Sequence, residues 1–224
     1  MTDQTRSGVG RFSRRPDIAA LSIAFTFGAL LNAFAMVTPV YELEGWFSRL
    51  LGVKSNLLVL SVLFAAFLVI APGLLLSLAA CVTKVLVRTP ETQGSLIVRY
   101  SYSFAPLGLG MWLAHYSYHF LSGIYTIIPV TQSALSSAGF SLLGIPRWNL
   151  TGMPKTVVEP LEFGFLLLGL FGSLLVAYHL AQQESVIKPW RPFIPWAAIF
   201  LFLWSASVWM VQQPMDMRAT FISG

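Results

Sequence analysis

Two histidines four residues apart, His115 and His119, are the residues of this chain best suited to chemistry. On an α-helix this spacing places both imidazoles on one face, one turn apart. Imidazoles exchange protons near neutral pH and bind transition metals. Both residues lie inside a long apolar segment, where polar groups are costly and indicate function. The pair is therefore the first candidate site in the sequence.

The composition indicates the environment of this pair. Of 224 residues, 56% are hydrophobic and 10% are charged, whereas about a quarter of the residues in a soluble domain are charged. The mean hydropathy of +0.71 agrees with an integral membrane protein. The net charge of +5 is concentrated in the first fifteen residues and in short loops, so it reports membrane orientation and not nucleic-acid binding. The single cysteine, Cys81, excludes an intrachain disulfide, and we expect it to be buried.

The apolar segments predict an all-α integral membrane protein with about five transmembrane helices and short interfacial helices. We expect a cytoplasmic tail over residues 1–17, a five-helix domain over 18–212 and an outer-side tail over 213–224. A span must cross roughly 30 Å of hydrocarbon at about 1.5 Å per residue. The segments long enough are residues 18–41, 56–86, 96–130, 158–181 and 193–211.

Prolines and amphipathic stretches refine this outline. Pro72 is expected to kink the second span, because proline lacks a backbone donor and crowds the preceding turn. Pro106 and Gly123 are expected to divide the third apolar segment into a crossing helix and flanking pieces. Residues 42–51 and 132–143 mix polar and apolar side chains in the way of helices that lie at the membrane interface.

The positive charges predict the orientation. With alternating sides, nine Lys and Arg residues fall on the side of the N-terminus and five on the other. The excess of positive charge marks the cytoplasmic side. We therefore expect a bacterial inner (cytoplasmic) membrane protein with a cytoplasmic N-terminus and a periplasmic C-terminus.

This topology converts residue numbers into depths. His115, His119, Glu159 and Glu162 fall about 7 to 16 Å from the bilayer centre, all toward the outer side. Tyr116 and the tail residues 215–217 lie near the same layer. His179 falls on the opposite side, on the order of 20 Å away along the membrane normal. A haem ligated by His179 and either His115 or His119 is therefore not expected, because axial ligands of one iron must lie at similar depth.

Two chemistries suit the outer layer. Quinol oxidation needs proton acceptors with an exit to the outside, and His115, His119, Glu159, Glu162 and Tyr116 are candidates for a quinone site or proton relay. Alternatively, His115, His119 and Glu162 offer two imidazoles and a carboxylate as ligands for copper or zinc.

Structural interpretations remain open beside these functions. Glu159 and Glu162 also suit the start of a helix, where the dipole favours carboxylates and Pro160 fits the first turn. His119 and the tyrosines also suit the aromatic belt at the interface.

Several segments together resemble the transmembrane part of membrane-bound polyferredoxin-like proteins of bacterial respiratory chains. The segments are residues 38–41 (TPVY), 44–46 (EGW), 99–108 (RYSYSFAPLG), 110–116 (GMWLAHY), 119–120 (HF) and 213–218 (QPMDMR). The resemblance covers most of the chain from residue 20 onward. In that group a multi-helix membrane unit accompanies four-iron ferredoxin modules. The resemblance implies a membrane anchor and a quinone site for a redox partner, with His115 and His119 as positions of interest.

The chain departs from that group because it has no Cys-x2-Cys-x2-Cys run. Any iron–sulfur cluster would belong to a partner subunit. No nucleophile and base constellation, phosphate loop or dinucleotide fingerprint is present, which argues against an independent soluble-type enzyme. Three hypotheses follow: a membrane subunit of a respiratory electron-transfer complex with other redox subunits as partners, a copper- or zinc-binding membrane protein, and a purely structural assembly subunit.

Overall fold

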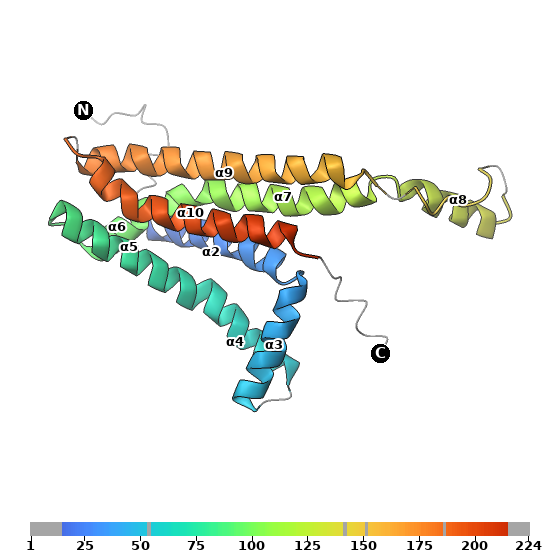
Figure 1. The fold of residues 1–224 in the computed structure, drawn as a ribbon, viewed down its shortest axis with the longest axis horizontal. Helices are drawn as coiled ribbons and strands as arrows, with labels where there is room; N and C mark the ends of the chain where they lie inside the picture. Colours follow the sequence, from blue (N-terminus) through green and yellow to red (C-terminus); the bar gives the residue numbers. More distant parts are fainter. Residues whose placement is uncertain (1–14, 53–54, 141–142, 151, 186, 215–224) are drawn as a thin grey trace.

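The computed structural model describes residues 15–52, 55–140, 143–150, 152–185 and 187–214, and the regular structure within these ranges is helical. The α-helices are α2 (Pro16–Phe34), α3 (Thr38–Leu51), α4 (Asn56–Ala65), α5 (Ala71–Val87), α6 (Gln93–Ser101), α7 (Ala105–Gly123), α8 (Ile127–Ser137), α9 (Lys155–Glu184) and α10 (Trp190–Gln212). A π-turn, η1 (Ala66–Ile70), joins α4 to α5, and a 3-10 turn, η2 (Tyr102–Phe104), joins α6 to α7. In Figure 1, α2, α7, α9 and α10 run side by side.

Four helical segments are long and apolar enough to cross a membrane: α2, residues 57–87, α9 and α10. The predicted all-α membrane fold is therefore confirmed. α7 runs alongside α9 in the bundle, but its glycines, serines and histidines make it less apolar than the other four. The fifth crossing through α7 stays a prediction, as does the orientation in the membrane. Most of the predicted tails, residues 1–14 and 215–224, lies outside the described residues.

Irregular turns lie beside two of the prolines. A π-turn over residues 66–70 precedes Pro72, because a proline that cannot donate to the preceding turn favours a local change of hydrogen-bond register. Pro106 follows the 3-10 turn at the start of α7, and α7 ends at Gly123. The predicted first span, residues 18–41, is wrong at its C-terminal end: α2 already ends at Phe34, and Pro39 lies in the first turn of α3, the helical position that proline favours.

The contact between α7 and α9 depends on glycine. A Cβ atom on Gly110 would lie 2.6 Å from the Phe165 carbonyl oxygen, and one on Gly169 would lie 2.9 Å from the Pro106 carbonyl oxygen. The two backbones therefore touch, as small residues allow in membrane helices. On the other side of α7, a Cβ on Gly108 would lie 2.6 Å from Thr26 Oγ1 of α2. α7 is thus held between α2 and α9.

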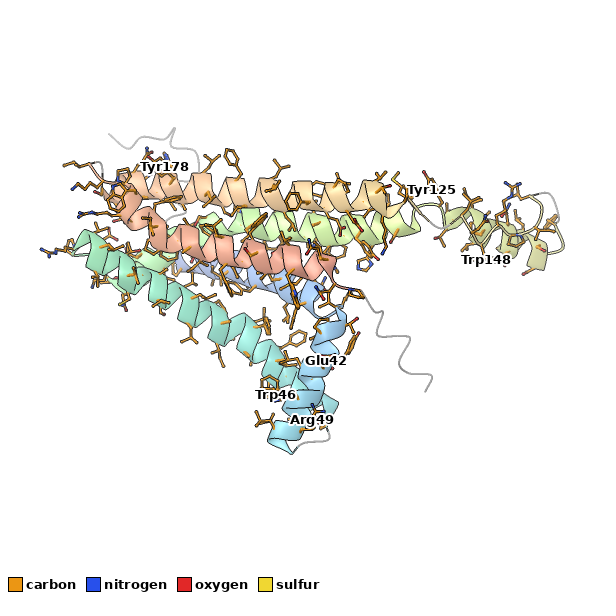
Figure 2. The ribbon with its side chains drawn as sticks, in the orientation of Figure 1. Glu42, Trp46, Arg49, Tyr125, Trp148 and Tyr178 are labelled. Atoms are coloured by element: carbon orange, nitrogen blue, oxygen red, sulfur yellow. The ribbon has the colours of Figure 1, made fainter. Side chains whose placement is uncertain are left out.

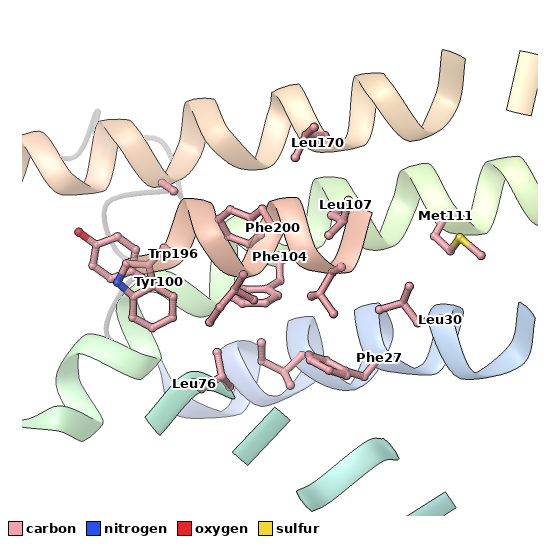
Figure 3. Close-up of a cluster of buried hydrophobic side chains, with 14 of the residues drawn as sticks. Phe27, Leu30, Leu76, Tyr100, Phe104, Leu107, Met111, Leu170, Trp196 and Phe200 are labelled. Atoms are coloured by element: carbon pink, nitrogen blue, oxygen red, sulfur yellow. The ribbon is translucent and has the colours of Figure 1, made fainter. Parts of the chain in front are cut away.

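Aromatic rings fill the core beside α6 and the start of α10 (Figure 3). The rings of Tyr100 and Trp196 stack with centroids 4.5 Å apart and planes within 2°. Phe104 packs edge-on against Phe200 at 4.7 Å. Trp196 also donates its indole N–H to Thr83 Oγ1 at 3.1 Å, which ties α10 to α5. Cys81, which we expected to be buried, is exposed on α5.

Charged residues close the same end of the bundle, which we call the Arg99 end. The Arg99 guanidinium donates to Glu91 Oε1 at 2.7 Å and also to Glu184. The Glu184 side chain is 5% exposed and that of Arg99 is 18% exposed. Ser95 Oγ donates to the second oxygen of Glu91 at 2.8 Å. One guanidinium thus joins the turn before α6 to the last residue of α9.

Two elements leave the bundle at its opposite end. α3 crosses the bundle axis and carries the exposed side chains of Trp46 and Arg49, in agreement with an interfacial helix (Figure 2). α8 lies beyond the ends of α7 and α9. It begins five residues earlier than the predicted 132–143 helix and ends at Ser137. The segment that follows it carries exposed Phe140, Ile145 and Trp148.

Candidate functional site

The α7–α9 contact sets the heights of His115 and Glu162. Gly110 lies opposite Phe165 and Gly169, and the two helices run in opposite directions. His115 is five residues after Gly110. Glu162 is three residues before Phe165 and seven before Gly169, which is five residues on average. At about 1.5 Å per residue, both lie about 7.5 Å from the contact, toward the same end. The structure therefore brings these two predicted residues to one height.

The two residues nevertheless lie on different faces of the bundle. His115 is seven residues after Gly108, which contacts α2, so it lies on the α2 side of α7. Glu162 is seven residues before Gly169 and therefore lies on the α7 side of α9. The ring of His119 packs against that of His115 with centroids 4.6 Å apart. The histidine pair and the carboxylate are thus separated by the body of α7.

A cavity of about 490 Å³ opens beside Glu162, between the first turns of α9, the last turns of α10 and Tyr118 of α7. We call this the cavity end of the bundle. The polar side chains that line the cavity are Tyr118, Lys155, Glu159, Glu162, Gln212 and Gln213. Its apolar wall is formed by Val158, Phe163, Val208 and Val211. The volume and this mixture of an apolar wall with a few polar groups are typical of small-molecule sites.

Buried polar atoms at this height lack protein partners. Within the described residues, both ring nitrogens of His115, Nε2 of His119, Oε1 of Glu162 and Nε1 of Trp204 have no hydrogen-bond partner. Trp204 belongs to the same layer, because its ring packs 6.0 Å from that of Phe163. His115 is 1% exposed and Glu162 is 2% exposed. Leaving such a group unsatisfied costs about 1 to 3 kcal/mol of folding free energy. A polar ligand that supplies the missing hydrogen bonds in this layer recovers part of that cost.

The remaining predicted residues divide between cavity and surface. Glu159 is exposed and lines the cavity, one turn nearer the start of α9 than Glu162. Tyr116 is 45% exposed and packs against Trp112, with ring centroids 4.8 Å apart; it does not line the cavity. Tyr118 lines the cavity instead. His179 is exposed on α9, seventeen residues from Glu162, or about 25 Å along the helix, as the sequence predicted.

The helix-start interpretation of the two glutamates is wrong. α9 begins at Lys155, with Pro154 as its N-cap residue, and its first turn holds no acidic residue. Pro160 is inside the helix. Glu162 therefore lies in the third turn, too deep for the helix dipole to explain a buried carboxyl group, since that effect is confined to the first turn.

The metal alternative has no geometric support in the described part of the chain. Within these residues, no three His, Cys, Asp or Glu side chains come together as a metal site. His115 and His119 share a face, but Glu162 is on another helix and approaches α7 from the α9 side. A divalent site of this ligand set would require at least three of these groups around one ion.

Four cavity residues were missed at the sequence level: Lys155, Phe163, Gln212 and Gln213. Lys155 was counted only as a loop charge, and the two glutamines only as the end of the last span. The signal that identifies Lys155 is its spacing: residues 155, 159 and 162 follow the i, i+4, i+7 pattern of one helix face. Comparison with protein-family models, with curated proteins and with solved structures found no match to this chain.

Proposed function

We propose that this protein is an integral membrane subunit of a bacterial electron-transfer complex, and that its cavity binds a quinol at the outer leaflet. The observation that carries the proposal is Glu162: a carboxyl group 2% exposed, with an oxygen that has no partner among the described residues, which lines a cavity of about 490 Å³. A buried carboxylate beside a substrate-sized space is suited to accept a proton from a bound hydroxyl group.

The reaction has a simple balance. A quinol loses two protons and two electrons to become a quinone. Glu162 accepts the first proton from the bound quinol. Iron–sulfur clusters of a partner subunit would supply the acceptors for the two electrons, one electron at a time. Glu159, one turn nearer the start of α9 and exposed, accepts the second proton and releases both in turn to the outer aqueous phase. His115 and His119 do not line the cavity. The ring of His119 meets its lining only at Tyr118, with centroids 5.6 Å apart.

The anchoring role is supported by the segment around α8. Ile127, Phe140, Ile145 and Trp148 are 68%, 56%, 87% and 58% exposed, and this segment extends beyond the ends of α7 and α9 (Figure 2). Exposed apolar side chains beyond the ends of the bundle suit contact with a partner protein or with the membrane surface. A redox partner that docks here would lie next to the cavity.

The test has two parts. Isothermal titration of the purified chain in nanodiscs with menadione, a short naphthoquinone, is expected to show binding that Glu162→Ala weakens about tenfold. The reason is that the protonated Glu162 carboxyl group, the state left after proton transfer, donates a hydrogen bond to a carbonyl oxygen of the quinone. Gentle detergent extraction from the source cells is expected to yield a complex with iron–sulfur absorption whose quinol-linked turnover falls in Glu162→Gln. No binding of menadione by the wild type, or full turnover in Glu162→Gln, would overturn the proposal. A change in complex assembly alone would favour the purely structural role.

A further inference from the structure

Lys155 is the one cation that lines the cavity, among the residues that the structure describes. The ion pairs found in those residues are Arg15–Asp17, Arg99–Glu91 and Arg99–Glu184, so no carboxylate lies within 4.0 Å of the Lys155 ammonium. Two carboxyl groups nevertheless line the same cavity. An ammonium that stays apart from nearby carboxylates is available for a ligand.

The start of α9 adds to this charge. Lys155 is the first residue of a helix of 30 residues, and no side chain caps that end. The first N–H groups of a helix lack partners within it and carry a partial positive charge. The cavity therefore has a positive rim, formed by Lys155 and the helix start, and a buried acidic wall at Glu162, seven residues or about 10 Å deeper along α9.

The acidic wall and the positive rim suit, respectively, the neutral and the ionised state of one ring ligand that carries oxygen. A neutral quinol presents a hydroxyl hydrogen to Glu162. After that proton has moved to the Glu162 carboxylate, the ligand is an anion with its charge on the oxygen beside Glu162. The Lys155 ammonium is carried on a flexible four-carbon stem, which extends from the rim toward this oxygen and stabilises it by a charge-assisted hydrogen bond. A cluster of the partner subunit would then take the electrons from this anion.

We infer that Lys155 determines the specificity of the cavity, by binding the ionised oxygen of the ring ligand while Glu162 holds its proton. The inference rests on the proposed quinol site and names a residue and a ligand class for it: quinols and hydroxyquinones whose oxygen carries negative charge. Lys155 is thus a binding residue for the anion and not an acceptor of protons.

A matched pair of ligands tests this role. Menadione, 2-methyl-1,4-naphthoquinone, is neutral, and 2-hydroxy-1,4-naphthoquinone has the same ring system but is ionised at neutral pH. In titrations of the full chain, Lys155→Met is expected to weaken binding of the hydroxy compound about tenfold and that of menadione less than about threefold. Lys155→Arg keeps the charge and is expected to keep most of the preference. Lys188→Met, on an exposed residue at the Arg99 end, is the matched control and is expected to change neither affinity.

The outcomes separate the two proposals. If Lys155→Met weakens the binding of both ligands equally, the side chain only shapes the cavity. If it weakens the binding of neither, the side chain does not contact the ligand. Both results overturn the role of Lys155 and leave the quinol site intact. Absence of menadione binding by the wild type overturns the quinol site itself. A thermal unfolding midpoint equal to that of the wild type shows that Lys155→Met remains folded.

Discussion

The two ends of the bundle differ in how far their buried polar groups are paired. At the Arg99 end, one guanidinium binds two carboxylates and the indole of Trp196 binds a threonine. The Tyr100 hydroxyl is the one buried side-chain atom at that end that lacks a partner in the described chain. At the cavity end, Glu162, His115 and Trp204 are buried without partners in the described chain. Networks with their hydrogen bonds satisfied hold a fold together, whereas unsatisfied groups reduce stability and are retained where a ligand uses them. The contrast assigns structure to one end and binding to the other.

The largest expected effect tests the structural end. Arg99→Met leaves the nearly buried Glu184 without its cation, and breaking such a pair from one side costs about 3 to 5 kcal/mol. A marked fall in the thermal unfolding midpoint of the purified protein is expected. Arg49→Met, on the exposed surface of α3, is the control and is expected to shift stability by no more than about 0.5 kcal/mol. A similar small shift for Arg99→Met would remove the distinction between the two ends.

The second largest effect is expected at the contact between α7 and α9, which lies between the two ends of the bundle. Gly110→Ala places a methyl group 2.6 Å from the Phe165 carbonyl oxygen, and overpacking of this kind costs about 1 to 3 kcal/mol. Gly164→Ala is the matched control, because a Cβ there meets nothing within 4 Å. Thermal unfolding of both variants measures the difference.

A substitution at the cavity end is expected to have the opposite effect on stability, that is, to raise the free energy of unfolding. Glu162→Leu removes a buried carboxyl group that lacks a partner, so it is expected to raise the free energy of unfolding by about 1 kcal/mol while weakening menadione binding about tenfold. Unfolding and titration on the same preparation measure both effects. A variant that loses stability as well as binding would show that Glu162 supports the fold as Arg99 does.

The smallest expected effect concerns the histidines. His115→Leu is expected to change menadione affinity less than about twofold, because His115 lies on the α2 side of α7 and does not line the cavity. Its stability is expected to rise by roughly 0.5 kcal/mol, since two ring nitrogens without partners are removed. A tenfold loss of affinity would instead join the histidine pair and the cavity into one site.

Sequence reasoning succeeded where a single helix determines the answer. Apolar length predicted the helices, Pro72 and Pro106 marked the places of the irregular turns, and the rise per residue placed His115 and Glu162 in one layer. It failed where the answer depends on which helices are neighbours. Depth alone grouped His115 with Glu162. The two residues lie on opposite sides of α7 because of glycine contacts to Thr26 and Phe165, which come from distant parts of the chain. Lys155 was missed because α9 begins three residues before the apolar stretch.

The touching backbones at Gly110 and Gly169 have a consequence at a distance. Because a Cβ on either residue would collide with the opposite helix, α7 and α9 cannot slide past each other by a turn, about 5.4 Å, without driving side chains into that contact. The contact at Gly110 and Gly169 therefore fixes the alignment of Tyr118 with Glu159 and Glu162 along the helix axes, and hence the shape of the cavity. Neither glycine has a side chain or lines the cavity. A survey of substitutions restricted to the cavity wall would not reveal them.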